Sequence, residues 1–306
     1  MAYHRVMNLA GLSFRDLEYV VAVAELGSFG KAAERCRVAQ PSLSVQVSKL
    51  EARLKTVIFE RTTRRVIVTA EGQKLVEQMR RILLEVRGLL ELSSRSGEPF
   101  GGTLRLSAIA TLGPYYFPHI LQPLRSRYPG LSFILGEGRT DDLVVALLHG
   151  DLDAVLMSTP VEEAGLSAMA LFIEPFVMAC PSGHVASAPG GPGWADLGAH
   201  ERLLLEEGHC LRDQAIAACS EVDASNRHAT SLETLKYMVA AGEGCTLMPG
   251  LAASHSPGLA YRPLDGGEYA RTIVLAWRRS DPRAGEFEAL GAGLRQLQHP
   301  AIRSLA

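Results

Sequence analysis

Apolar positions in the first hundred residues follow a helical repeat. Five of them recur every three or four positions before Gly27: Phe14, Leu17, Val20, Val21 and Ala24. Gly27 stands where such a helix would end, and Ser28 is suited to cap a second helix over 29–35. Gln40-Pro41-Ser42 then opens a third helix over 41–54, with proline in the first turn. The pattern predicts three helices joined by short turns.

The third predicted helix has two distinct faces. Its apolar face consists of Leu43, Val47, Leu50 and Leu54. Its polar face consists of Ser42, Gln46, Lys49 and Arg53. One face can pack on a core while the other offers donors and a cation, as a recognition helix in a DNA major groove requires. A plain surface helix is the structural alternative, and the helix-turn-helix spacing argues against it.

Two further elements follow this helix. Basic residues between Arg61 and Arg65 precede the β-branched run Val66-Ile67-Val68, which predicts a hairpin wing that carries arginine to phosphates or the minor groove. A long helix is expected over 70–94. Its apolar positions are Leu75, Met79, Ile82, Val86 and Leu89. Their near-heptad spacing favours a dimerisation seam, and packing onto the helix's own domain is the alternative.

Charge separates the two ends of the chain. Residues 1–98 hold 16 basic and 11 acidic residues, a balance of +5, while the remainder holds 15 and 22, a balance of −7. A basic head on an acidic body suggests a nucleic-acid-binding module joined to a sensing module. No segment approaches the 18 or so apolar residues of a membrane span, and the N-terminus lacks a signal-peptide core. We therefore expect a cytosolic protein with no membrane contact.

Beyond residue 100, strands and helices alternate. Strands are expected over 103–107, 131–135, 154–157, 175–180 and 273–277, and helices over 113–127, 140–149, 231–241 and 286–298. This alternation predicts an α/β fold with parallel βαβ units. The Gly-x-Ser-x-Gly, Walker and His-Glu-x-x-His motifs are all missing from the sequence. We therefore expect neither an enzyme nor a cofactor.

Cys210 and Cys219 are the most informative of the five cysteines. If the segment between them is helical, a rise of about 1.5 Å per residue puts their Cα atoms roughly 13–14 Å apart. A disulfide needs them within about 7 Å, so joining them would require the segment to unwind, as in a redox switch. Incidental packing is the alternative. No two cysteines lie two to four residues apart, so no metal site is expected, and Cys36, Cys180 and Cys245 are expected to fill the core.

The N-terminal motifs resemble those of LysR-type transcriptional regulators. They are Ser28…Ala32-Ala33, Gln40-Pro41-Ser42-Leu43-Ser44, Lys49-Leu50-Glu51, Phe59-Glu60-Arg61 and Thr69…Gly72. The resemblance implies a winged helix-turn-helix over 12–69, a linker helix over 70–94 and a two-lobed effector domain over 101–306, similar to periplasmic binding proteins. Lobe I would cover about 101–173 and 278–306, and lobe II about 174–277. Lys55 departs from the pattern, because the family usually has glycine there, so a less regular helix end is expected.

The same resemblance implies DNA-contacting residues and partners. The residues are Gln40, Pro41, Ser42, Ser44, Gln46, Lys49, Arg53, Arg61, Arg64 and Arg65. The implied partners are promoter DNA, further copies of the chain in a dimer and then a tetramer, and RNA polymerase, for an activator associated with the nucleoid.

The segment around the cysteines resembles one branch of that family more closely. Gly208-His209-Cys210-Leu211-Arg212-Asp213-Gln214 with Cys219 looks like the peroxide-sensing OxyR branch. The resemblance implies that Cys210 reacts with hydrogen peroxide and that Cys219 resolves it in a disulfide. The implied peroxide pocket consists of Thr111, Thr140, His209, Asp213 and Arg278. The alternative is a LysR-type regulator that binds a small metabolite between its lobes, with incidental cysteines.

Overall fold

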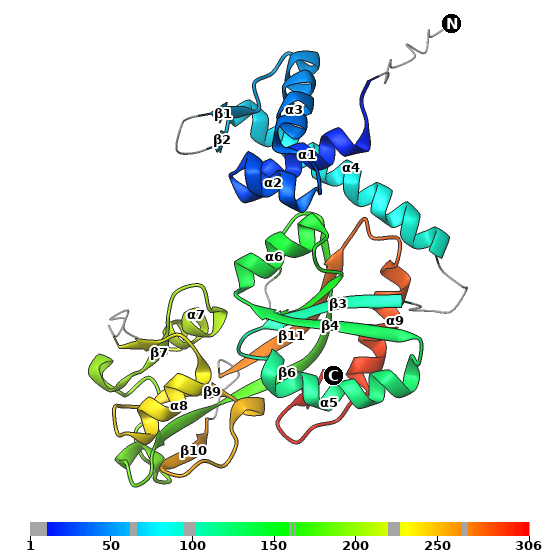
Figure 1. Ribbon diagram of the computed structural model, residues 1–306. Coiled ribbons are helices and arrows are strands. Elements are labelled where there is room, and N and C mark those ends of the chain that lie inside the picture. Colours follow the sequence, from blue (N-terminus) through cyan, green and yellow to red (C-terminus); the bar gives the residue numbers. More distant parts are fainter. Residues whose placement is uncertain are drawn as a thin grey trace, which may run out of the picture. The chain divides into compact units, whose positions relative to one another are not determined.

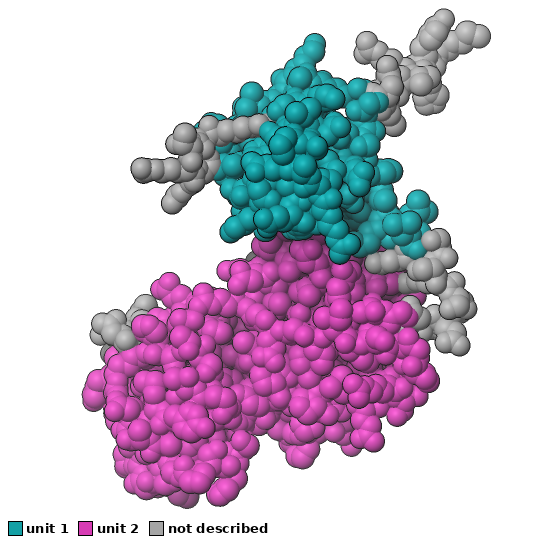
Figure 2. All heavy atoms as spheres, in the orientation of Figure 1, with its two compact units in different colours: residues 1–94 teal, residues 95–306 magenta. Residues whose placement is uncertain are grey.

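The computed structural model describes residues 11–61, 66–94, 102–158, 161, 163–219, 227–264 and 269–305. The chain divides into two compact units, residues 1–94 and residues 95–306 (Figure 2). Unit 1 has one hydrophobic core, and unit 2 has two. Among the described residues, no helix combines the length and the apolar character that a membrane span needs.

Unit 1 begins with the three predicted helices. They are α1 (Phe14–Leu26), α2 (Phe29–Arg35) and α3 (Gln40–Leu54). Ser13 and Asp16 form a capping box at the start of α1, and Gly27 ends it in the left-handed conformation with φ 57°. Ser28 accepts a hydrogen bond from the Lys31 amide at the start of α2. The predicted helix ends are therefore confirmed by their caps.

Helix α3 has the two faces that the sequence predicts. Leu43, Val47 and Leu50 are buried in the core of unit 1, and Leu54 is half-buried. Ser42, Gln46, Lys49 and Arg53 are exposed. Lys55 ends the helix in the left-handed conformation at φ 53°, and its amide donates to the Ala52 carbonyl. The helix end is thus regular, because lysine adopts the conformation that glycine would take at lower energetic cost.

The wing is present as a short antiparallel hairpin. It consists of β1 (Phe59–Arg61) and β2 (Val66–Val68), with Phe59 opposite Val68. The Glu51 carboxylate ties the end of α3 to the wing by accepting from the Ile58 amide at 2.8 Å and the Phe59 amide at 3.0 Å. Arg64, Arg65 and the side chain of Arg61 lie outside the described residues.

The long helix α4 spans Ala70–Ser94. Met79 is buried in the core of unit 1, and Leu75 and Ile82 pack against that core. Leu89 and Leu90, one to two turns further on, are 66% and 64% exposed. The first half of the predicted seam therefore packs on its own unit, while Leu89 in the second half is exposed.

Lobe I of unit 2 contains a mixed sheet with a parallel part (Figure 1). Its elements are β3 (Gly102–Ile109), α5 (Gly113–Arg127), β4 (Leu131–Gly138), α6 (Thr140–His149), β5 (Ala154–Ser158), the first half of β6 (Leu166–Pro181), β11 (Ala270–Arg278), α9 (Ala284–Arg295) and β12 (Arg303–Ser304). Strand β3 pairs in parallel with both β4 and β5, which confirms the predicted βαβ units. Strand β11 runs antiparallel between β5 and β6.

Lobe II is built around the second half of β6, which pairs with β9 and β10. Its elements are β7 (Leu204–Leu205), α7 (Cys210–Ala217), β8 (His228–Ala229), α8 (Leu232–Ala240), β9 (Thr246–Pro249), β10 (Leu259–Pro263) and the 3-10 turns η1 (Val185–Ser187), η2 (Ala199–Glu201) and η3 (Gly250–Ala252). Strand β6 is continuous through both lobes, so it forms one rigid connection between them.

The structure moves one predicted lobe boundary. The expected lobe II reached residue 277, yet Ile273 pairs with Ser158 of β5 and Trp277 pairs with Ala154. The apolar run 273–277 is buried in the core of lobe I. A strand between two neighbours in a sheet covered on both faces needs such a continuous apolar run. Lobe II therefore ends before Ala270.

Candidate redox site between the two lobes

Hydroxyl groups gather at one edge of the lobe I sheet. Thr111 follows β3, Thr140 begins α6 after β4, and Ser158 ends β5. Because β3, β4 and β5 are parallel, their carboxyl ends meet at the same edge, where α/β proteins commonly bind ligands. Helix α7 of lobe II reaches this edge, since the Gln214 amide donates to the Ser158 hydroxyl at 2.6 Å.

The loop that leads into α7 is held against the start of α6. Arg139, the residue before α6, forms an ion pair with Glu206. Gly208 has φ +89°, and a Cβ added there would lie 3.1 Å from Cδ of Arg139. Only glycine combines this backbone conformation with such close contact. The loop therefore fixes His209 and Cys210 beside the amino end of α6.

The two cysteines lie at opposite ends of α7 and pack against different cores. Cys210 is the first residue of the helix, is half-buried and contacts the core of lobe I. Cys219 lies two residues past the end of α7 and contacts the core of lobe II. Both are free thiols, so the structure has the reduced form of this pair. The condition considered in the sequence, a helical segment, is met over Cys210–Ala217, and a rise of about 1.5 Å per residue holds the two cysteines roughly 13 Å apart.

The pKa values of Cys219 and His209 are both shifted, mainly by burial. Burial raises the pKa of the Cys219 thiol, whose sulfur donates to the Ala215 carbonyl at 3.2 Å. His209 is only 7% exposed, and burial together with the nearby Arg139 guanidinium lowers the pKa of its imidazole. The His209 ring is therefore neutral at neutral pH and can donate or accept a proton beside Cys210.

The two predicted threonines differ in their partners. The Thr140 hydroxyl is buried and has no hydrogen-bond partner among the described residues. Such an orphaned group in a folded protein needs an explanation, and a bound ligand or water supplies one. The Thr111 hydroxyl instead accepts a hydrogen bond from Nη1 of Arg271 at 2.8 Å, and its carbonyl accepts from Nη2 at 3.0 Å.

Arg271 is the arginine that the structure brings to this edge, and the sequence prediction missed it. It lies near the start of β11, directly opposite Glu174 on β6, with 2.8 Å between guanidinium and carboxylate. Both side chains are fully buried. One signal was available in the sequence: Arg271 stands just before the apolar run 273–277. A charged residue is rarely buried in a strand unless it is paired with an opposite charge.

Arg278, the predicted pocket arginine, lies at the opposite edge. Its guanidinium donates to the carbonyls of Leu147 and Leu152 and to Asp281, at 2.9, 2.6 and 2.5 Å. The seven residues from Arg271 to Arg278 span about 23 Å of strand. Since β11 is antiparallel to β5, its end meets the start of β5, away from Thr111 and Thr140. Arg278 is therefore replaced by Arg271 in the candidate site. Asp213, the fifth predicted residue, is exposed in the first turn of α7.

Comparison with known proteins defines the class of both units. Residues 14–73 match the bacterial regulatory helix-turn-helix protein family of LysR type, and residues 97–298 match the LysR substrate binding domain. Together these matches define a LysR-type transcriptional regulator with an N-terminal DNA-binding domain and an effector domain.

Three relatives narrow the class. The DNA-binding transcriptional dual regulator OxyR of Escherichia coli is 41% identical over 290 residues, 93% of this chain and 95% of that protein. A full-length OxyR variant from Pseudomonas aeruginosa matches with a TM-score of 0.78 at 35% identity, covering 96% of this chain and 99% of the other. A hydrogen peroxide-bound OxyR mutant from Corynebacterium glutamicum matches with a TM-score of 0.61 at 32% identity, covering 93% and 94%. The chain belongs to the LysR family and, within it, to the OxyR branch.

Proposed function

We propose that this regulator senses hydrogen peroxide through Cys210 and Cys219 and passes the signal to promoter DNA. The observation that carries the proposal is the position of the two thiols at opposite ends of α7, each packed against a different lobe. A disulfide between them cannot form without changing both contacts. The peroxide bound by the related Corynebacterium protein supports hydrogen peroxide as the signal.

The proposed chemistry has two steps. The Cys210 thiolate attacks one oxygen of hydrogen peroxide, the O–O bond breaks, and the departing hydroxide takes a proton and leaves as water. The Cys219 thiol then attacks the sulfenic acid on Cys210, the S–S bond forms and a second water leaves. The orphaned Thr140 hydroxyl and neutral His209 are suited to hold the peroxide and protonate the departing oxygen.

Arg271 supports the attack on peroxide by positioning Thr111. Its guanidinium fixes both the hydroxyl and the carbonyl of Thr111, so the Thr111 hydroxyl proton is free to point toward a ligand. Its positive charge is partly balanced by Glu174. A cation near the reacting atoms stabilises charge that develops on the departing oxygen.

Oxidation would then change how the lobes are joined. Unwinding α7 removes Leu211 and Ala215 from the core of lobe II and breaks the hydrogen bond from Gln214 to Ser158 of lobe I. A helix of eight residues is marginal by itself, so packing is what holds it. We infer that the disulfide form is a second, differently packed state that alters the arrangement of the dimers on DNA.

The test is non-reducing peptide mapping after brief exposure to near-stoichiometric hydrogen peroxide. We expect a Cys210–Cys219 cross-link that forms quickly, is reversed by a thiol and is abolished in Cys210→Ser. Cys36→Ser is the matched control and should retain the cross-link. Slow, unselective oxidation of all five cysteines would contradict the proposal and favour a regulator that binds a metabolite between the lobes.

For DNA we propose recognition by the exposed face of α3. Gln46 and Lys49 lie on that face with Ser42 and Arg53. Arg61, Arg64 and Arg65 of the wing sequence are proposed as further contacts to DNA. Gln46→Ala should relax base preference, because an amide side chain reads base edges. Lys49→Ala should weaken all sequences alike and lower the salt slope by about one, because it neutralises a phosphate. An unchanged salt slope for Lys49→Ala would remove that residue from the interface.

The proposed assembly is a dimer of dimers that acts as an activator in the cytoplasm, at the nucleoid, in contact with RNA polymerase. The exposed Leu89 on α4 supports self-association. Leu89→Glu should shift the mass measured by light scattering towards the monomer. An unchanged mass would exclude this part of α4 from the interface.

A further inference from the structure

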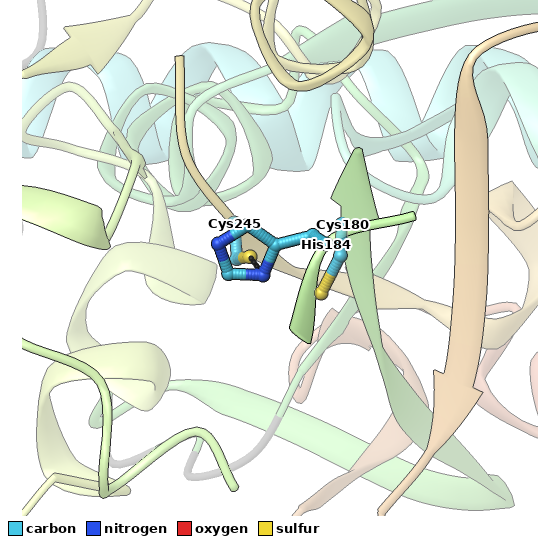
Figure 3. Close-up of side chains that lie close together, drawn as sticks. All are labelled: Cys180, His184 and Cys245. Atoms are coloured by element: carbon cyan, nitrogen blue, oxygen red, sulfur yellow. Dashed lines mark hydrogen bonds between the residues drawn. The ribbon is translucent and has the colours of Figure 1, made fainter. Parts of the chain in front are cut away.

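A second group of thiols lies in lobe II, on different elements from α7. Cys180 is near the end of β6, Cys245 directly precedes β9, and His184 precedes the turn η1 (Figure 3). The two sulfurs and one ring nitrogen of His184 all lie within 4.8 Å of one another. The Cys245 sulfur is 3.7 Å from Nδ1 of His184. This group differs from the expectation that Cys180 and Cys245 only fill the core and that no metal site is present, because residues 65 positions apart show no ligand spacing in the sequence.

The backbone explains why the three residues meet. In the antiparallel pair β6 and β9, Ala179 lies opposite Thr246, so the next position along brings Cys180 to Cys245. A turn after β6 then brings His184 back, with Gly183 at φ +84° and the His184 amide donating to the Pro181 carbonyl. The Cys245 backbone is fixed on its other side by bonds to Glu201 and Leu203.

The distances fit a small soft metal ion. A tetrahedral zinc ion with bonds of about 2.3 Å to sulfur and 2.0 Å to nitrogen separates two sulfurs by roughly 3.8 Å and sulfur from nitrogen by roughly 3.5 Å. The contact of 3.7 Å between Cys245 and His184 already has that length. The remaining separations, at most 4.8 Å, need to shorten by no more than about 1.3 Å.

We propose that Cys180, His184 and Cys245 bind a thiophilic d10 metal ion, Zn²⁺ or Cu⁺. Two thiolates and one imidazole are the ligands that select these ions over Mg²⁺ or Ca²⁺. Both cysteines are fully buried, and His184 is half-buried, so the ion would enter from the histidine side. Among the described residues no further histidine, cysteine or carboxylate joins the group. The ion therefore takes three protein ligands, which suits trigonal Cu⁺ directly and Zn²⁺ with one water.

The hydrogen bonding of His184 leaves a ring nitrogen suited to a metal ion. Nδ1 of His184 accepts a hydrogen bond from the Ala186 amide at 3.2 Å, so that nitrogen carries the lone pair a metal requires. Binding releases the protons of both thiols and replaces the bond from Ala186 with a metal–nitrogen bond.

Such an ion would give lobe II a fixed point beside its moving part. The three ligands tie the turn after β6 to the strand that precedes β9, while α7 changes shape. The assignment stands on this cluster alone and does not require the peroxide proposal.

The test uses the full-length protein, purified under reducing, chelator-treated conditions and titrated separately with Zn²⁺ and with Cu⁺ under anaerobic conditions. We expect one ion per chain by native mass spectrometry, a rise in Tm, and, with Co²⁺ in place of Zn²⁺, a thiolate-to-metal charge-transfer absorption band. Cys180→Ala with Cys245→Ala should weaken binding by at least about 100-fold. His184→Gln, which keeps the buried thiols, should weaken it while leaving the fold of the metal-free protein intact.

The matched control is Cys210→Ser with Cys219→Ser, which should bind the ion as the parent does. Uptake of only one of the two ions identifies the metal. Failure of both to bind at micromolar concentration, or binding that survives the paired alanine substitution, would overturn the proposal. A Cys180–Cys245 disulfide that forms with peroxide in place of any metal uptake would also overturn it and make the pair a second redox couple.

Discussion

The two cysteine pairs of lobe II are held in opposite ways. Cys210 and Cys219 are nine positions apart in the sequence, yet α7 separates them and gives each a different core to pack against. Cys180 and Cys245 are far apart in the sequence, yet the pairing of β6 and β9 brings them together. The first pair must move to react, whereas the second is already assembled. Cys180 and Cys245, which lie close together in the folded state, are therefore the static pair. Cys210 and Cys219, which a short helix separates, are the pair proposed to act as a switch.

The two pairs differ because the elements that carry them are held by different numbers of neighbours. Strand β6 has 16 residues and pairs with β10 on one side and β9 on the other near Cys180. Helix α7 has eight residues, and only Leu211 and Ala215 are buried. Strand positions paired on both sides open only with global unfolding, whereas a short helix can open locally. A local conformational change is thus available to α7 and not to the strands around Cys180.

The largest expected effect on stability and on the rate of Cys210 oxidation comes from removing the positive charge of Arg271. Arg271→Met leaves Glu174 buried without its partner, so the free energy of unfolding should fall by about 3–5 kcal/mol. Oxidation of Cys210 by peroxide should slow by about 100-fold, because a preorganised donor next to developing charge is lost. Stopped-flow peroxide kinetics and chemical denaturation measure the two effects. Metal binding at Cys180 and Cys245 should be retained in the variant.

Two further variants separate a local effect from lost stability. Arg271→Lys keeps a charge opposite Glu174 but loses the forked hydrogen bonds to Thr111, so it should slow oxidation with a smaller loss of stability. Arg278→Met breaks a network at the other edge of the sheet and should destabilise lobe I with little effect on the rate. An equal slowing by Arg278→Met would return that residue to the pocket.

These two arginines show where sequence reasoning stops. Helices and their caps could be predicted, because Gly27, Ser28 and Pro41 act on their immediate neighbours. The choice between Arg271 and Arg278 could not, because it depends on the direction of β11 in the sheet. Both flank the same apolar run, and only the antiparallel pairing with β5 sends one to each edge.

The same limit applies to the cysteines. The helical spacing from Cys210 to Cys219 is a local property, so the separation of the switch pair could be predicted from the sequence. The meeting of Cys180 with Cys245 depends on the register between two strands joined by a long excursion through η1, η2, α7 and α8. No local pattern encodes such a register. The contact between His184 and Cys180 is more local, because only three residues separate the two in the sequence.

A smaller effect is expected from weakening α7 itself. Ala217 is exposed at the end of the helix, and Ala217→Gly lowers helix stability by up to about 1 kcal/mol. Since the disulfide closes only after α7 unwinds, closure from the sulfenic acid should accelerate by up to about 5-fold. Quenched-flow mapping of the Cys210–Cys219 peptide measures this rate. Ala240→Gly at the exposed end of α8 weakens the same lobe and should not accelerate closure; equal acceleration by both would mean that unwinding of α7 is not the limiting step.

The smallest expected effect is a pH dependence confined to the α7 region. Burial and the Arg139 guanidinium lower the pKa of His209 in the folded protein, so the folded state binds fewer protons than the unfolded chain at mildly acidic pH. The resulting stability is fully present above the ordinary histidine pKa of about 6.5 and is lost as the pH falls below it toward the folded pKa. Hydrogen exchange, corrected for intrinsic rates, should show α7 amides opening more readily at about pH 5.5 than at about pH 7.5, with β6 unchanged. His209→Asn should remove this difference. A loss of protection in β6 of the same size would mean that acid loosens the whole lobe, and the contrast between a movable and a fixed region would then not hold.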